Sequence, residues 1–481
     1  MPTTSTTTNG ANGAHDSRSN SIPPVTKILA SFVADADPST YLTPRVRDRL
    51  KEYILDFIGV TLAAGSTSDS TPSFLQAVTA LGGRTGSSTV LGQGKHFTPQ
   101  YAGLLNAALG HSLDFDDTYA KGTLHAGVTA IAAGLTQAEI NGDGGSGIDD
   151  FLVAVAVGYE ITCRLGREMG NDAYARGFHN TSTCGVFGAV ATICVLKHLP
   201  VQTVLDAFGL AGSKAAGSMQ YLANGSWNKR LHPGFAVHDA FVAVALAEAG
   251  VLGAADIFEG TFGFLHAYSP KPDKDLGHLS SELGERWEFL DTSLKPFPAC
   301  RMTHGFIEHA TRLGREKGHT KASDYKTVTL SLSPANVSVV GAPIPNKVHP
   351  ANMVDAQFSA YFTAAHSFLY GSGAGVGAYE RQRLDDPQIR ELSDKITCVG
   401  DESIREFGSR IEVEYADGSK EVVDIPYPLG EVQHPFTRDQ VDQKFFSLVN
   451  PVLGEKRALR IRDVVNEIEK HNSMHVDFPG R

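Results

Sequence analysis

Small apolar residues dominate several long helical segments, and this feature constrains the fold more than any other. Examples are the stretches AAGLTQAE, GVFGAVATIC and FVAVALAEAG. Apolar residues run most of the way round these segments, so the predicted helices must be buried against other helices. Side chains as small as alanine and glycine let two helix backbones approach closely. The sequence therefore predicts a mainly α protein with a large all-helical domain.

Helical periodicity marks where these helices lie. Apolar residues recur three and four positions apart over residues 46–64, 102–113, 148–169, 185–198, 201–215 and 235–250. Gly65 follows the first of these stretches and acts as a stop signal.

The pattern changes near residue 285, which predicts a smaller α+β domain. Residues 326–340 alternate and are rich in valine, threonine and serine, as in a strand. Residues 411–415 and 420–425 flank an Asp-Gly turn, a signal for a hairpin, and residues 355–370 have a helical pattern. We predict a disordered polar tail over 1–24, a helical domain over 25–284, an α+β lid domain over 285–430, and C-terminal helices over 431–481 that rejoin the helical domain.

Composition excludes some classes of protein. The chain has 481 residues, with 42 basic and 53 acidic side chains and a net charge of −11. That charge argues against a nucleic-acid binder or a protein held on an anionic membrane. The chain contains no run of about 18 apolar residues, and its polar N-terminus lacks the apolar region of a signal peptide. We therefore expect a cytoplasmic protein.

Cysteine usage limits the available chemistry. The five cysteines are widely spaced and form no Cys-x-x-Cys pair. A disulfide framework, a zinc ribbon and an iron–sulfur cluster are therefore not expected.

The densest polar cluster is HSLDFDDT, residues 111–118, followed by Thr123-Leu124-His125. Its carboxylates, Asp114, Asp116 and Asp117, are expected to raise each other's pKa, which suits proton transfer. The alternative is a helix end with solvated aspartates. A Mg²⁺ site of the terpene-synthase type would need D-D-x-x-D, and the spacing here differs. A metal hydrolase could add His238-Asp239, a pair that is common by chance.

Three further segments place histidines or cations ahead of helices. His179 stands just before a helix of small residues, where the helix dipole would lower its pKa and favour the neutral base. Lys229 and Arg230 precede the helix that is expected from about residue 235. Lys295, Arg301 and His304 precede another. A helix N-terminus with cations is a good carboxylate receptor, and the alternative is a solvated basic loop.

Together these segments resemble the MmgE/PrpD family, which includes 2-methylcitrate dehydratases, alkylcitrate dehydratases and cis-aconitate decarboxylases. The resemblance covers nearly the whole chain after the tail. It is carried in order by LKEYILDFIGVTLAAG, HSLDFDDT with LHAG, FHNTSTCGVFGA, KRLHPGFAVHDA and KPFPACRMTHG.

The resemblance implies a helical domain built from both chain ends, a smaller α+β lid, an active site between them, a homodimer, and catalysis without a metal or organic cofactor. By position it implies catalytic roles for Asp114, His125, His179 and Lys229, and substrate binding by Lys295. Two positions depart from or vary within the family: Ala126 stands where proline often follows the Leu-His pair, and Cys300 stands where some relatives carry histidine.

We therefore predict a lyase that dehydrates a citrate-type tricarboxylate, 2-methylcitrate or a longer alkylcitrate, in a secondary pathway. Dehydration needs a base for the proton α to a carboxylate and an acid for the departing hydroxyl, and histidine or lysine can serve as either. Decarboxylation of cis-aconitate is the alternative; iminodisuccinate epimerisation and metal-dependent hydrolysis rank behind it. The expected substrate-binding groups are Lys295, Arg301, Arg230 and His304.

Overall fold

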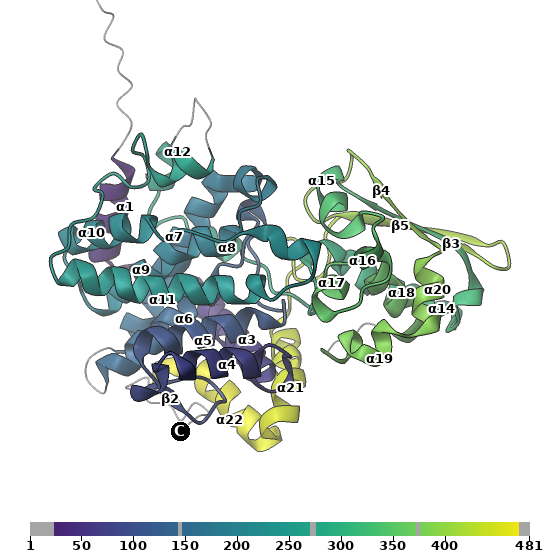
Figure 1. Ribbon diagram of the computed structural model, residues 1–481, viewed down its shortest axis with the longest axis horizontal. Helices are drawn as coiled ribbons and strands as arrows, with labels where there is room; N and C mark the ends of the chain where they lie inside the picture. Colours follow the sequence, from purple (N-terminus) through teal and green to yellow (C-terminus); the bar gives the residue numbers. More distant parts are fainter. Residues whose placement is uncertain (1–23, 143–146, 270–275, 372–375, 471–481) are drawn as a thin grey trace, which may run out of the picture.

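The computed structural model describes residues 24–142, 147–269, 276–371 and 376–470. These residues form a large helical body and a smaller α+β lobe beside it (Figure 1). The predicted fold class, mainly α with a small α+β part, is confirmed. Except for Pro24, the predicted polar tail lies outside the described residues.

The helical body is built on close contacts between long helices. The main ones are α1 (Val25–Ala34), α3 (Pro44–Thr67), α5 (Pro99–Ser112), α6 (Gly127–Asn141), α7 (Ile148–Ala175), α9 (Gly185–Leu196), α10 (Val201–Gly212) and α11 (Asn228–Glu248). Small residues permit this packing, as predicted from the sequence. A Cβ atom at Gly188 of α9 would lie only 1.9 Å from Thr162 Oγ1 of α7, so any larger residue would push the two helices apart.

Both ends of the described chain contribute to this body. Helices α21 (Arg438–Leu453) and α22 (Glu455–Asn466) pack on α3, below the body in Figure 1. Their apolar residues belong to the same hydrophobic core as those of α1 to α11. Lys444 of α21 lies 2.6 Å from Asp56 of α3 and donates a hydrogen bond of 2.8 Å to the carbonyl of Phe115. The C-terminal helices therefore support the loop that follows α5.

The smaller lobe has its own core and one four-stranded sheet in the order β4-β3-β5-β6. Its strands are β3 (Tyr325–Leu332), β4 (Ile396–Gly400), β5 (Ser409–Tyr415) and β6 (Lys420–Ile425). Strand β4 runs parallel to β3, and the other pairs are antiparallel. The predicted hairpin is confirmed as β5 and β6. Helices α14 (His304–Lys317), α18 (Ala360–Tyr370) and α20 (Pro387–Ser393) complete the lobe.

Two predicted elements of this lobe are shorter than expected. The strand predicted over 326–340 ends at Leu332, because Pro334 opens α15 (Pro334–Asn336) and a π-helical turn follows over Val337–Gly341. Proline favours the first turn of a helix and cannot donate to a sheet. The helix predicted over 355–370 is divided into α17 (Met353–Gln357) and α18, because the Ser359 side chain accepts a hydrogen bond from the Phe362 amide and caps α18.

Helix α11 differs from its prediction in a way that affects the site. It begins at Asn228 rather than near residue 235, and Pro233 lies within it. Lys229 and Arg230 are therefore in its first turn instead of in a loop ahead of it. Among the described residues, no helix combines the length and apolar character that a membrane crossing requires.

Candidate active site

A small pocket lies where the body meets the smaller lobe. Its walls come from the loop after α5, the segment around His125, the ends of α7 and α11, and the segment that leads into α14. The lining residues are Asp114, Thr118, Tyr119, Thr123, Leu124, His125, Tyr174, His179, Lys229, Lys295, Cys300, Arg301, Met302, Phe358 and Phe407. The Gln357 amide ties the two parts together by donating to the carbonyls of Leu113 and Pro298. The pocket therefore contains most of the residues that the sequence singled out.

Asp114 holds the two lysines of the pocket together. The chain turns sharply there, because Asp114 takes a left-handed conformation (φ 50°) directly after α5. Its Oδ1 lies 2.7 Å from Lys229 Nζ and 3.0 Å from Lys295 Nζ, and its carbonyl accepts a 2.7 Å hydrogen bond from Lys295. Although burial raises the pKa of Asp114, the two ammonium groups lower it well below its usual value. Asp114 is therefore held as a carboxylate.

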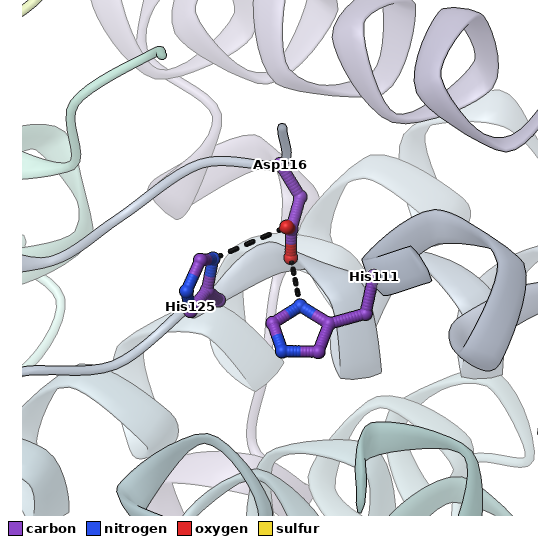
Figure 2. A group of neighbouring side chains, drawn as sticks. All are labelled: His111, Asp116 and His125. Carbon is purple, nitrogen blue, oxygen red and sulfur yellow. Dashed lines mark hydrogen bonds and ion pairs between the residues drawn. The ribbon is translucent and has the colours of Figure 1, made fainter. Parts of the chain in front are cut away.

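Asp116 lies between two histidines, His111 and His125, and Figure 2 shows one carboxylate oxygen directed to each ring. His111 Nδ1 is 2.7 Å from Asp116 Oδ2. His125 Nδ1 is 3.2 Å from Asp116 Oδ1, with the ring turned out of line for a good hydrogen bond. His125 Nε2 lies 3.7 Å from Asp114 Oδ1. His125 thus contacts both carboxylates, one through each ring nitrogen.

The contacts of His111 fix its tautomer. Lys229 Nζ lies 3.0 Å from His111 Nε2 and has only protons to offer, so Nε2 accepts and Nδ1 carries the proton toward Asp116. Burial, together with the nearby Lys229 ammonium, lowers the pKa of His111 to about 3 despite Asp116, so the ring is neutral. Burial also lowers the pKa of His125, although Asp116 opposes the shift. A neutral imidazole can act as a base.

His111, Asp116 and His125 also form a group that could hold a metal ion, with ligand atoms within 4.8 Å of one another. The surrounding charges fit a metal poorly. The Lys229 ammonium is already bonded to the far nitrogen of His111, and a divalent cation would be placed beside this charge at high electrostatic cost. We interpret the three residues as a hydrogen-bonded acid–base group. The expected absence of a metal stays a prediction.

His179 approaches the pocket from another direction, at the N-terminus of the short helix α8 (Asn180–Thr183). Its Nδ1 lies 3.0 Å from Nδ1 of His232 in α11, so one ring must carry the shared proton. This contact leaves Nε2 of His179 as the nitrogen that can meet a substrate. Burial lowers the pKa of His179 well below its ordinary value, and the neighbouring His232 and Lys229 lower it further. His179 is therefore neutral as predicted, but through burial and its neighbours rather than through the helix dipole that the sequence suggested.

The three aspartates of the loop do not behave alike, which corrects the expectation that each would have a raised pKa. Only Asp117 does: burial and the neighbouring Asp116 raise its pKa to about 7. Asp117 accepts hydrogen bonds from the Tyr159 hydroxyl at 2.8 Å and from the Gly127 amide at 3.1 Å. It does not line the pocket, and these contacts fasten the start of α6 to α7.

Arg301 lines the pocket from the smaller lobe. Its Nε donates to Glu431 Oε1 at 2.5 Å, and its Nη1 donates to His304 Nδ1 and to the carbonyl of Leu429. Its Nη2 is buried and has no hydrogen-bond partner among the described residues. An unpaired guanidinium nitrogen in a buried pocket is costly unless a ligand completes it. Arg301 is therefore suited to bind a carboxylate.

Two of the expected substrate-binding residues lie elsewhere. His304 stands behind Arg301: its Nε2 is 3.0 Å from the carbonyl of Ala299, and its Nδ1 accepts from Arg301. Arg230 is bonded to Asp69, to the hydroxyls of Ser68 and Ser70 and to the sulfur of Met353. Neither residue lines the pocket. Their positions support a structural role for Arg230 and a positioning role for His304.

Sequence reasoning gave no individual role to His111, His232, Phe358 and Glu431, and it treated Asp116 only as one of three similar aspartates. His111 and Asp116 lie in the polar cluster that the sequence identified, so a signal was present but did not separate them from their neighbours. Glu431 is far along the chain from Arg301, and no local pattern pairs them. Phe358 lies 5.7 Å from Lys229 Nζ, measured to the ring centre, and forms an apolar wall.

A helical body, a smaller α+β lobe and a buried pocket of cations and neutral histidines between them define a protein with an acid–base site for a small anion. The chain matches the MmgE/PrpD N-terminal domain over residues 27–277 and the MmgE/PrpD C-terminal domain over residues 297–470. It therefore belongs to the MmgE/PrpD family.

Characterised relatives are similar over most of their length. A cis-aconitate decarboxylase-like protein of Aspergillus oryzae is 28% identical, over 92% of this chain and 94% of its own. The cis-aconitate decarboxylase of Aspergillus terreus is 27% identical over 88% and 89% of the two chains. The human cis-aconitate decarboxylase is 29% identical over 89% of each.

Proposed function

We propose that this protein is a lyase that removes water from a citrate-type tricarboxylate, 2-methylcitrate or a longer alkylcitrate, through its own acidic and basic side chains. The observation that carries this proposal is the charge of the pocket. Three cations line it, Lys229, Lys295 and Arg301, against one carboxylate, that of Asp114. Glu431 pairs with Arg301 from outside the lining, so the two lysines and Nη2 of Arg301 are the groups that a substrate with several carboxylates would meet.

The histidines supply the base in this proposal. His125 and His179 are neutral, so either can take the proton next to a substrate carboxylate. The negative charge that then develops on the carboxylate is stabilised by the lysines and Arg301, with each well-placed donor contributing about 3 kcal/mol.

The lysines supply the acid for the departing hydroxyl. Burial lowers the pKa of Lys295, which makes its ammonium group a better proton donor than an exposed lysine. Asp114 Oδ1 lies between His125 and the two lysines, at 3.7, 2.7 and 3.0 Å from their nitrogens. It can therefore orient the lysines and stabilise the histidine when that ring carries the abstracted proton.

Decarboxylation of cis-aconitate is the second candidate, and the names of the relatives favour it. Loss of CO₂ leaves a carbanion that needs a single proton, which the same histidines or lysines can give. The two reactions differ in where the substrate carboxylates lie, because the leaving carboxylate must turn away from the cations.

One experiment separates these candidates. The purified protein is incubated with 2-methylcitrate, a longer alkylcitrate and cis-aconitate, and the products are identified by mass spectrometry. We expect an alkylcitrate to lose water. If cis-aconitate loses CO₂ and both alkylcitrates remain unchanged, the proposed dehydratase function is wrong and the decarboxylase function takes its place. Stoichiometric Mg²⁺, Mn²⁺ or Zn²⁺ in the active protein would contradict the metal-free chemistry of both.

We also propose that the protein is a homodimer. Helix α11 exposes three large apolar residues on one face, Phe235, Val242 and Leu246, at 49%, 41% and 42% of their surface. Their spacing places them on one stripe, and a second copy could cover it. Light scattering coupled to size-exclusion chromatography measures the mass of the protein in solution. The Val242→Glu variant should shift the equilibrium from dimer toward monomer.

A further inference from the structure

A second and much larger cavity adjoins the candidate active site. It has a volume of 450 Å³, against 50 Å³ for the polar pocket. The two share four lining residues: Thr123, Tyr174, Met302 and Phe407. These shared residues form a neck between the cations on one side and the larger space on the other.

The larger cavity differs from the pocket in chemistry. Beyond the neck its walls include the apolar Met219, Leu222 and Val339 and the uncharged polar Ser333, Asn336 and Ser338, and none of its lining residues is a lysine, arginine or histidine. The one carboxylic side chain among its described lining residues is that of Glu406. A carboxylate would therefore find no cation there, whereas an apolar chain would find apolar walls.

Both lobes hold these walls in place. The Asn336 side chain donates a 2.7 Å hydrogen bond to the carbonyl of Glu406, and Glu406 has a left-handed conformation (φ 48°) directly before Phe407. On the other side, the Met219 amide donates to the carbonyl of Gly177 at 2.8 Å. Because hydrogen bonds to the backbone hold both walls, the cavity is a defined part of the interface between the helical body and the smaller lobe.

We propose that this cavity binds an apolar alkyl chain on the substrate, while the carboxylates occupy the polar pocket. The chain would pass between Tyr174, Met302 and Phe407 and end against Leu222 and Val339. The inference rests on the proposed function, because it requires the tricarboxylate head to lie at the lysines. With this cavity, the protein would be selective for tricarboxylates that carry a chain of several methylene groups over methylcitrate or cis-aconitate.

A series of alkylcitrates with increasing chain length tests the proposal. We expect kcat/KM to rise about fourfold for each methylene that enters the cavity, until the space is filled. Calorimetry on the same series measures affinity and needs no turnover, so it applies to either reaction. If kcat/KM and affinity stay constant or fall as the chain becomes longer than methyl, the proposal that the cavity binds the alkyl chain is wrong. If no tricarboxylate binds or reacts, the proposed function itself fails.

Filling the cavity gives a second test from both of its sides. Val339→Trp in the smaller lobe and Leu222→Trp beside the body should each lower the ratio of kcat/KM for a long chain to that for methyl by at least tenfold. Val422→Trp, on the exposed strand β6, is the matched control and should leave the ratio unchanged. If the cavity is instead a passage for all substrates, the cavity variants will slow every chain length alike and the ratio will not move.

Discussion

Two basic segments of this protein look alike in sequence and serve the pocket differently. Each contributes one lysine to Asp114: Lys229 from α11, and Lys295 from the segment before α14. Their arginines diverge, since Arg301 lines the pocket with an Nη2 that no described residue pairs, while both terminal nitrogens of Arg230 contact other side chains. The reason is local. Lys229 and Arg230 are neighbours in a helix, so their side chains point about 100° apart.

This comparison shows that a cluster of cations in a sequence does not tell which of them face a substrate. Within a helix, neighbouring side chains must separate, whereas the irregular segment of residues 295–301 can present both of its cations to one pocket. The variants below test that difference, in order of the expected loss of activity.

The lysines should be the most sensitive positions. Lys229→Ala or Lys295→Ala removes a cation that stabilises charge in the transition state, so kcat/KM should fall about 10³-fold. Steady-state kinetics measures the loss, with circular dichroism to show that the fold is kept. Lys95→Ala, at an exposed position, is the control and should be neutral. A loss of less than tenfold in both variants would remove the lysines from the reaction.

His125→Gln should lower kcat about 10²-fold or more, because an amide cannot take a proton. In the unaltered protein the lowered pKa of His125 keeps the base neutral below pH 6.5. The acid limb of the kcat/KM profile should therefore lie at a lower pH than for an ordinary histidine. If activity is instead lost at a pH above 6.5, the group that titrates in this part of the profile is not His125. His96→Gln, which alters an exposed histidine, should leave the profile unchanged.

Arg301→Leu should raise KM more than it lowers kcat, since Arg301 is expected to hold a carboxylate that does not react. A loss of about tenfold in binding corresponds to one charge-assisted hydrogen bond. His304→Gln should raise KM less, because it only loosens Arg301. If His304→Gln affects turnover more strongly than Arg301→Leu, the positions of these two residues have been interpreted incorrectly.

Arg230→Gln should have the smallest effect on activity and a clear effect on stability. Asp69, Ser68 and Ser70 lose their partner, so the free energy of unfolding should fall by about 1–3 kcal/mol. Urea unfolding measures the change, and kcat/KM should stay within about twofold of the unaltered protein. If Arg230→Gln raises KM as much as Arg301→Leu does, then Arg230 also contributes to substrate binding and the two segments do not differ in this respect.

Much of this could be predicted from the sequence. The small-residue helices, the hairpin and the family can be predicted from the sequence, because each depends on residues that are close together in the chain. The pocket also contains Asp114, His125, His179, Lys229, Lys295 and Arg301, the six singled-out residues that share it. The catalytic and binding roles of these six stay predictions.

The sequence could not show in which direction a side chain points, or which residues far apart in the chain come into contact. Asp116 and Asp117 are neighbours, yet one joins two histidines and the other fastens α6 to α7. No local pattern distinguishes them. Arg230 lies in the first turn of α11 rather than ahead of the helix, because α11 continues through Pro233 and begins at Asn228. Glu431 meets Arg301 across 130 positions of chain.

The support that α21 gives to the loop after α5 bears on how the protein is made. A ribosome has already produced every residue that lines the pocket by position 407, but Glu431 and Lys444 are still to come. The loop and Arg301 are therefore held in part by residues that are synthesised after all of the lining residues. A chain that ended after the smaller lobe would contain every residue that lines the pocket, but it would lack the two side chains that bond to Arg301 and to the loop after α5.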